Sequence, residues 1–231
     1  MAGIYYEVRG NGEPLVLLHG NGEDHHLFDG FAEVFDGDFQ LIAIDSRGHG
    51  RSEWLQPMTI DAMAEDVGCV LDELRIRSAH ILGFSDGGNV ALALALAYPK
   101  RIRSLVAVGA NLFPAGMLRR VRFSITMWYG LLCALAPLSK SFRKKKQIAD
   151  LMVHQPHIDS ARLKRIACPS LIIAGENDMI DEAHTRMIAS SIPGARLEII
   201  PGADHFCIVK TPDRFHKIVF KFLKSNVGRS A

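Results

Sequence analysis

A serine between small residues is the most chemically suggestive feature of this 231-residue sequence. The run Gly83-Phe84-Ser85-Asp86-Gly87 fits the pattern G-x-S-x-G, between an apolar stretch typical of a strand and an Ala/Leu-rich stretch typical of a helix. At such a turn the serine backbone is strained, and its second neighbours must be small because strand and helix nearly collide. The pattern predicts that the turn lifts the Ser85 hydroxyl, a candidate nucleophile, above the carboxyl end of a parallel sheet.

A nucleophilic serine needs a general base, and the base needs a group that fixes its tautomer. Asp178 follows the apolar run 170–174, and His205 follows the last predicted strand, 197–200. Both should converge with Ser85, because the carboxyl ends of parallel strands meet at one edge of the sheet. We therefore predict a triad of Ser85, Asp178 and His205, in the chain order expected for this topology. Three nearby carboxylates remain alternatives to Asp178, namely Glu176, Asp181 and Glu182.

The loop His19-Gly20-Asn21-Gly22 ends another predicted strand, 15–18, at the same edge. Its Asn21 backbone N–H, with that of Asp86 at the helix start, is predicted to form an oxyanion hole. His19 also has a structural interpretation, in which its ring bonds loop backbone. The residues predicted to contact substrate are His19, Gly20, Phe84, Trp128 and Phe206.

Strand and helix patterns alternate along most of the chain. Apolar runs at 4–9, 15–18, 40–44, 79–84, 104–108, 170–174 and 197–200 read as strands. Thr59 is a candidate cap for a helix that extends through Leu74, and Phe215 to Leu223 forms a closing amphipathic helix. The alternation predicts an α/β fold with a mostly parallel, doubly wound sheet, formed by residues 1–111 and 167–231.

Residues 112–166 break this alternation and are predicted to form a short helical cap. They contain eleven basic and two acidic residues, a net charge of +9, which leaves −7 on the rest of a chain whose total is +2. The basic run 143–146 is typical of a solvated helix face. The alternative hypothesis is attraction of an anionic substrate or an anionic membrane surface, with Trp128 and Tyr129 near the interface. The uncharged stretch 123–138 is shorter than the roughly 18–20 residues that span a bilayer, so no transmembrane segment is predicted.

Composition excludes several classes of protein. A charge of +2 argues against a nucleic-acid partner, and the four cysteines are scattered without a C-x-x-C pair. The N-terminus shows no signal-peptide pattern, so a cytoplasmic location is expected. His25 and His26 lack a third metal ligand at suitable spacing, and neither a metal nor another cofactor is expected. The oligomeric state is left open.

Together these motifs resemble the α/β-hydrolase superfamily over nearly the whole chain. The resemblance includes the strand-ending His19-Gly20, the loop Asp45-x-Arg47-Gly48-His49-Gly50-x-Ser52 and the cap position. The segment 83–89 is similar to that of small microbial serine carboxylesterases and valacyclovir-hydrolase-like members. Asp45, Arg47 and His49 are interpreted as a network that stabilises their loop. The departures are room for only one strand before Leu15 and a cap of about 55 residues, which is short for capped members.

The resemblance implies a serine hydrolase that cleaves a small carboxylic ester through an acyl-enzyme and needs no cofactor. The same triad also serves lactonases, thioesterases, carbon–carbon bond hydrolases and cofactor-free perhydrolases. Two alternatives belong to other classes, a ligand-binding or signalling protein with little turnover and a membrane-surface module acting through the basic cap.

Overall fold

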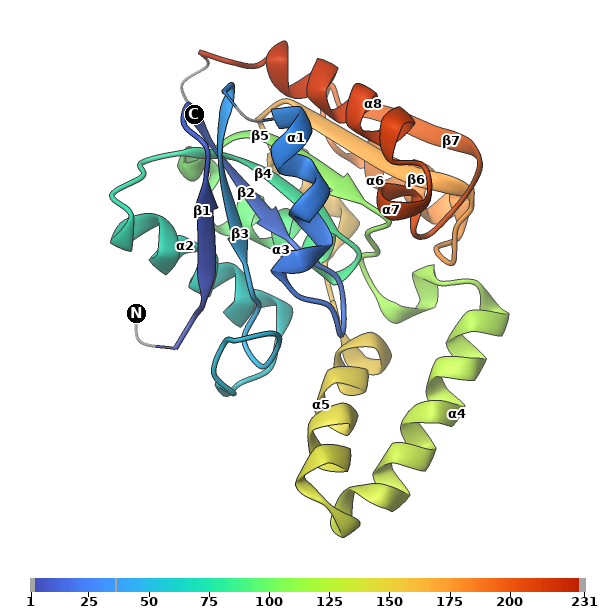
Figure 1. Ribbon diagram of the computed structural model, residues 1–231. Coiled ribbons are helices and arrows are strands. Elements are labelled where there is room, and N and C mark those ends of the chain that lie inside the picture. The colour runs from blue at the N-terminus through green and yellow to red at the C-terminus, as the bar shows by residue number, and fades with distance from the viewer. Residues whose placement is uncertain (1–2, 36, 229–231) are drawn as a thin grey trace.

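A computed structural model describes residues 3–35 and 37–228, which fold around a seven-stranded sheet (Figure 1). The strand order is β1-β3-β2-β4-β5-β6-β7; β2 to β7 are parallel, and β1 pairs antiparallel with β3. The strands are β1 Tyr6–Arg9, β2 Glu13–Leu18, β3 Phe39–Ile44, β4 Ala79–Phe84, β5 Ile102–Val108, β6 Ser170–Asn177 and β7 Arg196–Asp204. The predicted α/β class with a mostly parallel sheet is confirmed.

Helices cover both faces of the sheet, and successive strand residues supply two separate cores. In β2, Val16 and Leu18 pack towards the first core, whereas Leu15 and Leu17 pack towards the second. This alternation follows from the two-residue period of a strand, and it makes a strand covered on both faces apolar throughout. The first core takes residues from α2 (Ile60–Glu73), α3 (Asp86–Ala97) and α6 (Glu182–Ser191). The second takes residues from η1 (His25–Phe31), α1 (Ala32–Phe35), α7 (Cys207–Lys210) and α8 (Pro212–Lys224).

Local sequence signals set several of these boundaries. The Thr59 side chain accepts a hydrogen bond from the Ala62 N–H and begins α2, as predicted. The predicted strand 197–200 is too short, because β7 continues to Asp204. Pro201 would interrupt an inner strand but is tolerated here, since β7 lies at the edge of the sheet and Pro lacks only the backbone donor.

The interval between β5 and β6 consists of helices. It contains η3 (Pro114–Gly116), α4 (Arg119–Leu135), η4 (Ala136–Leu138), α5 (Lys140–His154) and η5 (Ser160–Arg165). Helices α4 and α5 form a hairpin that extends away from the sheet, with the α4–α5 turn at its far end (Figure 1). We call residues 119–154 the cap hairpin.

One helical segment among the described residues, Arg119–Leu138, is long and apolar enough by length and composition to cross a membrane. It has 20 residues, and an 18-residue window within it has a mean hydropathy of 1.4 and is 11% buried. The uncharged stretch 123–138 underestimates the length of this helical segment, because the helix begins four residues earlier, at Arg119. That the chain has no transmembrane segment stays a prediction.

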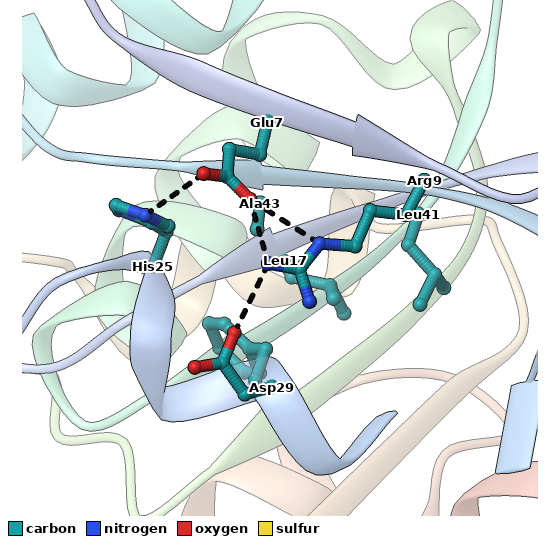
Figure 2. Close-up of a pocket in the computed structure, with 8 residues that line it drawn as sticks. Glu7, Arg9, Leu17, His25, Asp29, Leu41 and Ala43 are labelled. Atoms are coloured by element: carbon teal, nitrogen blue, oxygen red, sulfur yellow. Dashed lines mark hydrogen bonds and ion pairs between the residues drawn. The ribbon is translucent and has the colours of Figure 1, made fainter. Parts of the chain in front are cut away.

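A small cavity lies at the β1 side of the sheet (Figure 2). Glu7 faces both His25, at 3.3 Å, and Arg9, whose guanidinium also pairs with Asp29 at 3.3 Å. The cavity volume of about 10 Å³ holds no more than about one water molecule. The cavity is therefore too small for a substrate, and the ion pairs beside it link β1 to the segment 25–29.

Candidate active site

The turn around Ser85 has the strained geometry that its sequence predicts. Ser85 has φ 54° and ψ −119°, one of two non-glycine residues with positive φ in the described chain. A Cβ on Gly83 would lie 2.0 Å from the Gly87 carbonyl oxygen, and one on Gly87 would lie 2.1 Å from the Leu18 carbonyl oxygen. Both positions therefore require glycine, and the close packing of β4, α3 and β2 holds Ser85 in this conformation.

Three side chains from three loops form a hydrogen-bonded relay. The Ser85 Oγ lies 3.0 Å from His205 Nε2, and His205 Nδ1 lies 2.7 Å from Asp178 Oδ1. Ser85 follows β4, Asp178 follows β6 and His205 follows β7, so one edge of the sheet brings together residues up to 120 positions apart. In this arrangement Nε2 can take the hydroxyl proton while the carboxylate orients the ring.

The Asp178 carboxylate is fixed by its own loop as well as by His205. Its Oδ1 accepts the Ile180 N–H at 2.9 Å and its Oδ2 accepts the Gly175 N–H at 3.4 Å. Asp178 is buried, whereas Glu176 is exposed and accepts the Gly202 N–H. Asp181 begins α6 as its N-cap. Asp178 therefore contacts the His205 ring, whereas Glu176 and Asp181 are engaged elsewhere.

Gly109 forms a wall of the site that the sequence analysis missed. It directly follows β5, has φ 58°, and donates its N–H to the Ile173 carbonyl. A Cβ here would lie 2.7 Å from His205 Cε1 and 2.9 Å from Nδ1. Its only sequence signal is a glycine directly after an apolar strand, which does not reveal contact with a residue 96 positions away.

We expect Gly109→Ala to lower kcat/KM by about 10²-fold, because the methyl group displaces the His205 ring from Ser85. Gly194→Ala is the matched control, since Gly194 has φ 71° and a Cβ added there would meet nothing within 4 Å. Both variants should lose about 1 kcal/mol of unfolding free energy through backbone strain. Ester-hydrolysis kinetics and urea unfolding separate the two effects, and equal kcat/KM values for the two variants would contradict the assignment.

The loop after β2 lies against Ser85. A Cβ on Gly20 would be 3.0 Å from the Ser85 Cβ, so the residue directly before Asn21 touches the candidate nucleophile. The Asn21 side chain donates to Asp86 Oδ2 at 2.9 Å and to the Ile148 carbonyl of α5 at 2.9 Å. These bonds join the loop, the start of α3 and the cap hairpin. The Asp86 N–H, at the first position of α3, belongs to the helix-terminal donors that lack an intrahelical acceptor.

Two carboxyl groups next to the triad have raised pKa values. Burial raises the pKa of Glu23, whose Oε2 accepts the Gly20 N–H at 2.9 Å. A Cβ on Gly20 would be 2.7 Å from this Oε2, so the carboxyl borders the site. Desolvation also raises the pKa of Asp86, although hydrogen bonds from Asn21 and Asn89 oppose it. Sequence reasoning missed Glu23; the only available signal was an acidic residue directly after the glycine-rich loop.

The predicted substrate-contacting residues divide into two groups. The Phe84 ring lies 5.0 Å from the His205 ring, and the half-exposed Phe206 ring lies 5.5 Å from it. Gly20 borders Ser85, as described above. Trp128, by contrast, is exposed on α4 and has no hydrogen bond or ring contact with the triad within the described chain. Its role in substrate binding stays a prediction.

His19 is buried and its ring bonds loop backbone on both sides. Nδ1 donates to the Gly20 carbonyl at 2.7 Å, and Nε2 accepts the Ser46 N–H at 3.0 Å. This confirms its structural interpretation, while contact with substrate stays a prediction. Burial, together with the nearby His49, lowers the pKa of His19 to about 4.

The low pKa of His19 predicts a loss of stability in mild acid. The unfolded chain takes up this proton near pH 6.5, whereas the folded chain resists it until about pH 4, so stability falls between these values. From pH 7 to pH 5 the loss from this group is about 2 kcal/mol. His19→Gln retains a donor and an acceptor without titrating. In urea unfolding the native protein should therefore lose about 2 kcal/mol more than this variant; equal losses would contradict the explanation.

The loop after β3 is held by a buried network, as predicted. Arg47 forms a double hydrogen bond with Asp66 at 2.7 and 2.8 Å. Asp45 accepts bonds from the backbone N–H groups of His25 and Arg51. The His49 Nδ1 lies 3.1 Å from the Arg47 carbonyl. None of these three residues bonds the triad in the described part of the chain, which fits their interpretation as loop stabilisers.

The expectation that His25 and His26 lack a third metal-ligand neighbour is wrong. Asp24, His25 and His26 place possible ligand atoms within 4.8 Å of one another. The His25 ring nitrogens already face Asp45 at 2.8 Å and Glu7 at 3.3 Å, and Asp24 accepts the His26 N–H. These groups are therefore engaged in protein contacts and make a poor metal site.

A family model described as the alpha/beta hydrolase fold matches residues 13–132, which include Ser85 and the loop after β2. The chain belongs to the α/β hydrolase family. It is therefore a hydrolase of this family, and the resemblance drawn from the motifs is confirmed.

Relatives of this α/β hydrolase span almost its entire length. The pimeloyl-[acyl-carrier protein] methyl ester esterase of Nitrosomonas europaea is 29% identical, covering 93% of this chain and 97% of that protein. The serine hydrolase BPHL of Homo sapiens is 27% identical over 96% of this chain and 83% of its own. A crystal structure of a hydrolase from Pseudomonas aeruginosa PA01 has a TM-score of 0.78 and 30% identity, covering 95% and 94% of the two chains.

Proposed function

We propose that this protein is a serine hydrolase that cleaves a small carboxylic ester through an acyl-enzyme on Ser85. The observation that carries the proposal is the relay from Ser85 Oγ to His205 Nε2 at 3.0 Å and from Nδ1 to Asp178 at 2.7 Å. A hydroxyl with a base on one side and a carboxylate behind that base is suited to nucleophilic attack on a carbonyl carbon.

In the first step His205 Nε2 takes the Ser85 proton as Oγ attacks the ester carbonyl. The negative charge that develops on the carbonyl oxygen is stabilised by the backbone N–H groups of Asn21 and Asp86. The tetrahedral intermediate collapses, the carbon–oxygen bond to the alcohol breaks, and His205 gives the alcohol its proton. Asp178 keeps Nδ1 protonated and stabilises the charged imidazolium.

In the second step water replaces the alcohol. His205 removes a proton from the water, the resulting hydroxide attacks the acyl carbon, and the acid leaves as Ser85 regains its proton. No step needs an oxidant, a reductant or another reactant. Lactones follow the same route, since a lactone is an internal ester.

Trapping of the serine tests the proposal directly. A fluorophosphonate reacts with an activated serine and mimics the tetrahedral intermediate, so we expect one adduct, located on Ser85 by mass spectrometry of peptides. The same preparation should hydrolyse p-nitrophenyl esters, and the acyl chain length of best turnover measures the acyl pocket. Modification of a different serine, with turnover lost in parallel, would overturn the assignment.

A panel of substrates then resolves the reaction type. Ester, lactone, thioester and carbon–carbon cleavage substrates share the acyl-transfer route, and their relative kcat/KM values rank the alternatives. Labelling of Ser85 without turnover of any of these substrates would favour a binding or signalling role over catalysis.

A further inference from the structure

Apolar side chains point to solvent along α4. Phe123, Met127 and Leu131 follow each other at four-residue spacing and are 68, 61 and 50% exposed. This spacing places them on one side of the helix. Leu138 lies in the turn that joins α4 to α5, is 73% exposed and extends the apolar surface. Contiguous exposed apolar surface on a folded domain marks a contact with a partner or a membrane.

The opposite side of α4 is already occupied by α5. Leu132 is buried, and the Tyr129 hydroxyl donates to Asp150 of α5 at 2.6 Å. The Lys146 ammonium lies 5.2 Å from the centre of the Tyr129 ring. Because α5 covers one side of α4 and contacts it through polar groups, only the outer face of α4 can enter an apolar phase. This arrangement suits a helix that lies in a membrane interface rather than one that spans the bilayer.

The cap hairpin that carries the apolar face is strongly basic. The cap hairpin contains eight basic residues and one acidic residue, Asp150. Helix α5 begins at Lys140, two residues after Leu138, so its first turns place positive charge beside the turn. Within the described chain, six of the eight form no side-chain hydrogen bond, ion pair or ring contact: Arg119, Arg120, Arg122, Lys140, Arg143 and Lys145.

The charge of the whole chain favours one orientation. Residues 112–166 have a net charge of +9 and the remainder −7. A negatively charged surface therefore attracts the cap hairpin and repels the sheet domain. A second copy packed through the same face would bring two strongly cationic hairpins together, because a two-fold interface uses the same patch on both subunits. Charge thus selects an anionic apolar partner over self-association.

We propose that the outer face of the cap hairpin binds an anionic lipid bilayer, with Phe123, Met127, Leu131 and Leu138 in the interface and the basic residues at the lipid phosphates. The combination of an apolar face with flanking cations is that of an interfacial helix. This surface is independent of the proposed ester hydrolysis, and its test needs no turnover.

Cosedimentation with vesicles tests the surface. The Ser85→Ala protein should bind vesicles of phosphatidylglycerol and phosphatidylcholine at least tenfold more tightly than phosphatidylcholine alone, and added salt should weaken this binding. Two variants should each reduce binding at least tenfold. One removes charge (Arg120→Gln, Lys140→Gln, Arg143→Gln and Lys145→Gln), and the other removes apolar surface (Phe123→Ser, Met127→Ser and Leu131→Ser).

Matched controls lie on the sheet domain. Lys100→Gln, Arg196→Gln, Lys217→Gln and Lys221→Gln remove four exposed cations from it, and Val8→Ser with Val209→Ser removes exposed apolar surface. Both should bind the anionic vesicles as the parent does. Equal loss in the charge control and the hairpin charge variant would show a nonspecific effect of net charge and overturn the proposal.

Tryptophan emission locates the contact. The chain has two tryptophans, so Trp54→Phe leaves Trp128, on α4, as the reporter. Its emission should shift to shorter wavelength with anionic vesicles and be quenched by brominated acyl chains. No shift and no cosedimentation would overturn the proposal, as would a dimer in analytical ultracentrifugation that the apolar variant dissociates. Charge variants that raise KM for a soluble anionic ester without changing vesicle binding would instead assign the cations to substrate attraction.

Discussion

Ser85→Ala is expected to reduce kcat for ester hydrolysis by about 10⁶-fold, leaving only the residual rate that substrate binding and the oxyanion donors supply. The reason is chemical, since alanine has no nucleophile and His205 then has no hydroxyl proton to accept at 3.0 Å. KM should change little, because the Asn21 and Asp86 N–H groups and the Phe84 and Phe206 rings stay in place. The measurement is steady-state hydrolysis of the best p-nitrophenyl ester, with the pre-steady-state burst as a second readout.

Ser46→Ala serves as the control for Ser85→Ala. Ser46 lies in the loop after β3, and within the described chain its side chain forms no hydrogen bond, so its loss should leave kcat unchanged. Alanine at position 85 inherits the φ of 54° without a larger side chain, so urea midpoints of the two variants should agree closely. Substantial turnover by a folded Ser85→Ala protein would disprove the nucleophile assignment.

Local sequence patterns predict the turn around Ser85 and the triad because each part has its own signal. Gly83 and Gly87 are required by contacts within the turn itself, and Asp178 and His205 each follow an apolar strand. The parallel arrangement then brings them together without further information, since its strands end at one edge. This is why residues 120 positions apart could be assigned to one site from the amino-acid sequence.

Contacts that depend on three-dimensional packing could not be predicted from the sequence. The approach of Gly109 to the His205 ring and of Glu23 to Gly20 joins loops whose relative positions no periodicity encodes. The extension of β7 past Pro201 depends on its edge position, and strand order is a property of the whole sheet. The apolar outer face of α4 reverses the usual rule that an amphipathic helix buries its apolar side.

Asp178→Asn is expected to lower kcat by about 10⁴-fold while the geometry is kept. Asp178 Oδ1 accepts from His205 Nδ1 and from the Ile180 N–H. An asparagine with its oxygen in the Oδ1 position still accepts both N–H groups, so the ring stays in place. It carries no negative charge, however, and therefore cannot stabilise the imidazolium that forms when His205 takes the Ser85 proton. Steady-state ester kinetics give kcat, and the backbone amide pattern in NMR spectra reports whether the fold is retained.

Two isosteric variants of neighbouring carboxylates complete the experiment. Asp181 is the N-cap of α6, and asparagine caps as well as aspartate, so Asp181→Asn should retain both stability and kcat. Glu176→Gln keeps an acceptor for the Gly202 N–H and should also retain kcat. A large loss in either control with native-like activity of Asp178→Asn would transfer the role of orienting His205 to that neighbour. Loss confined to Asp178→Asn would instead tie the reaction to the 2.7 Å contact between Asp178 and His205.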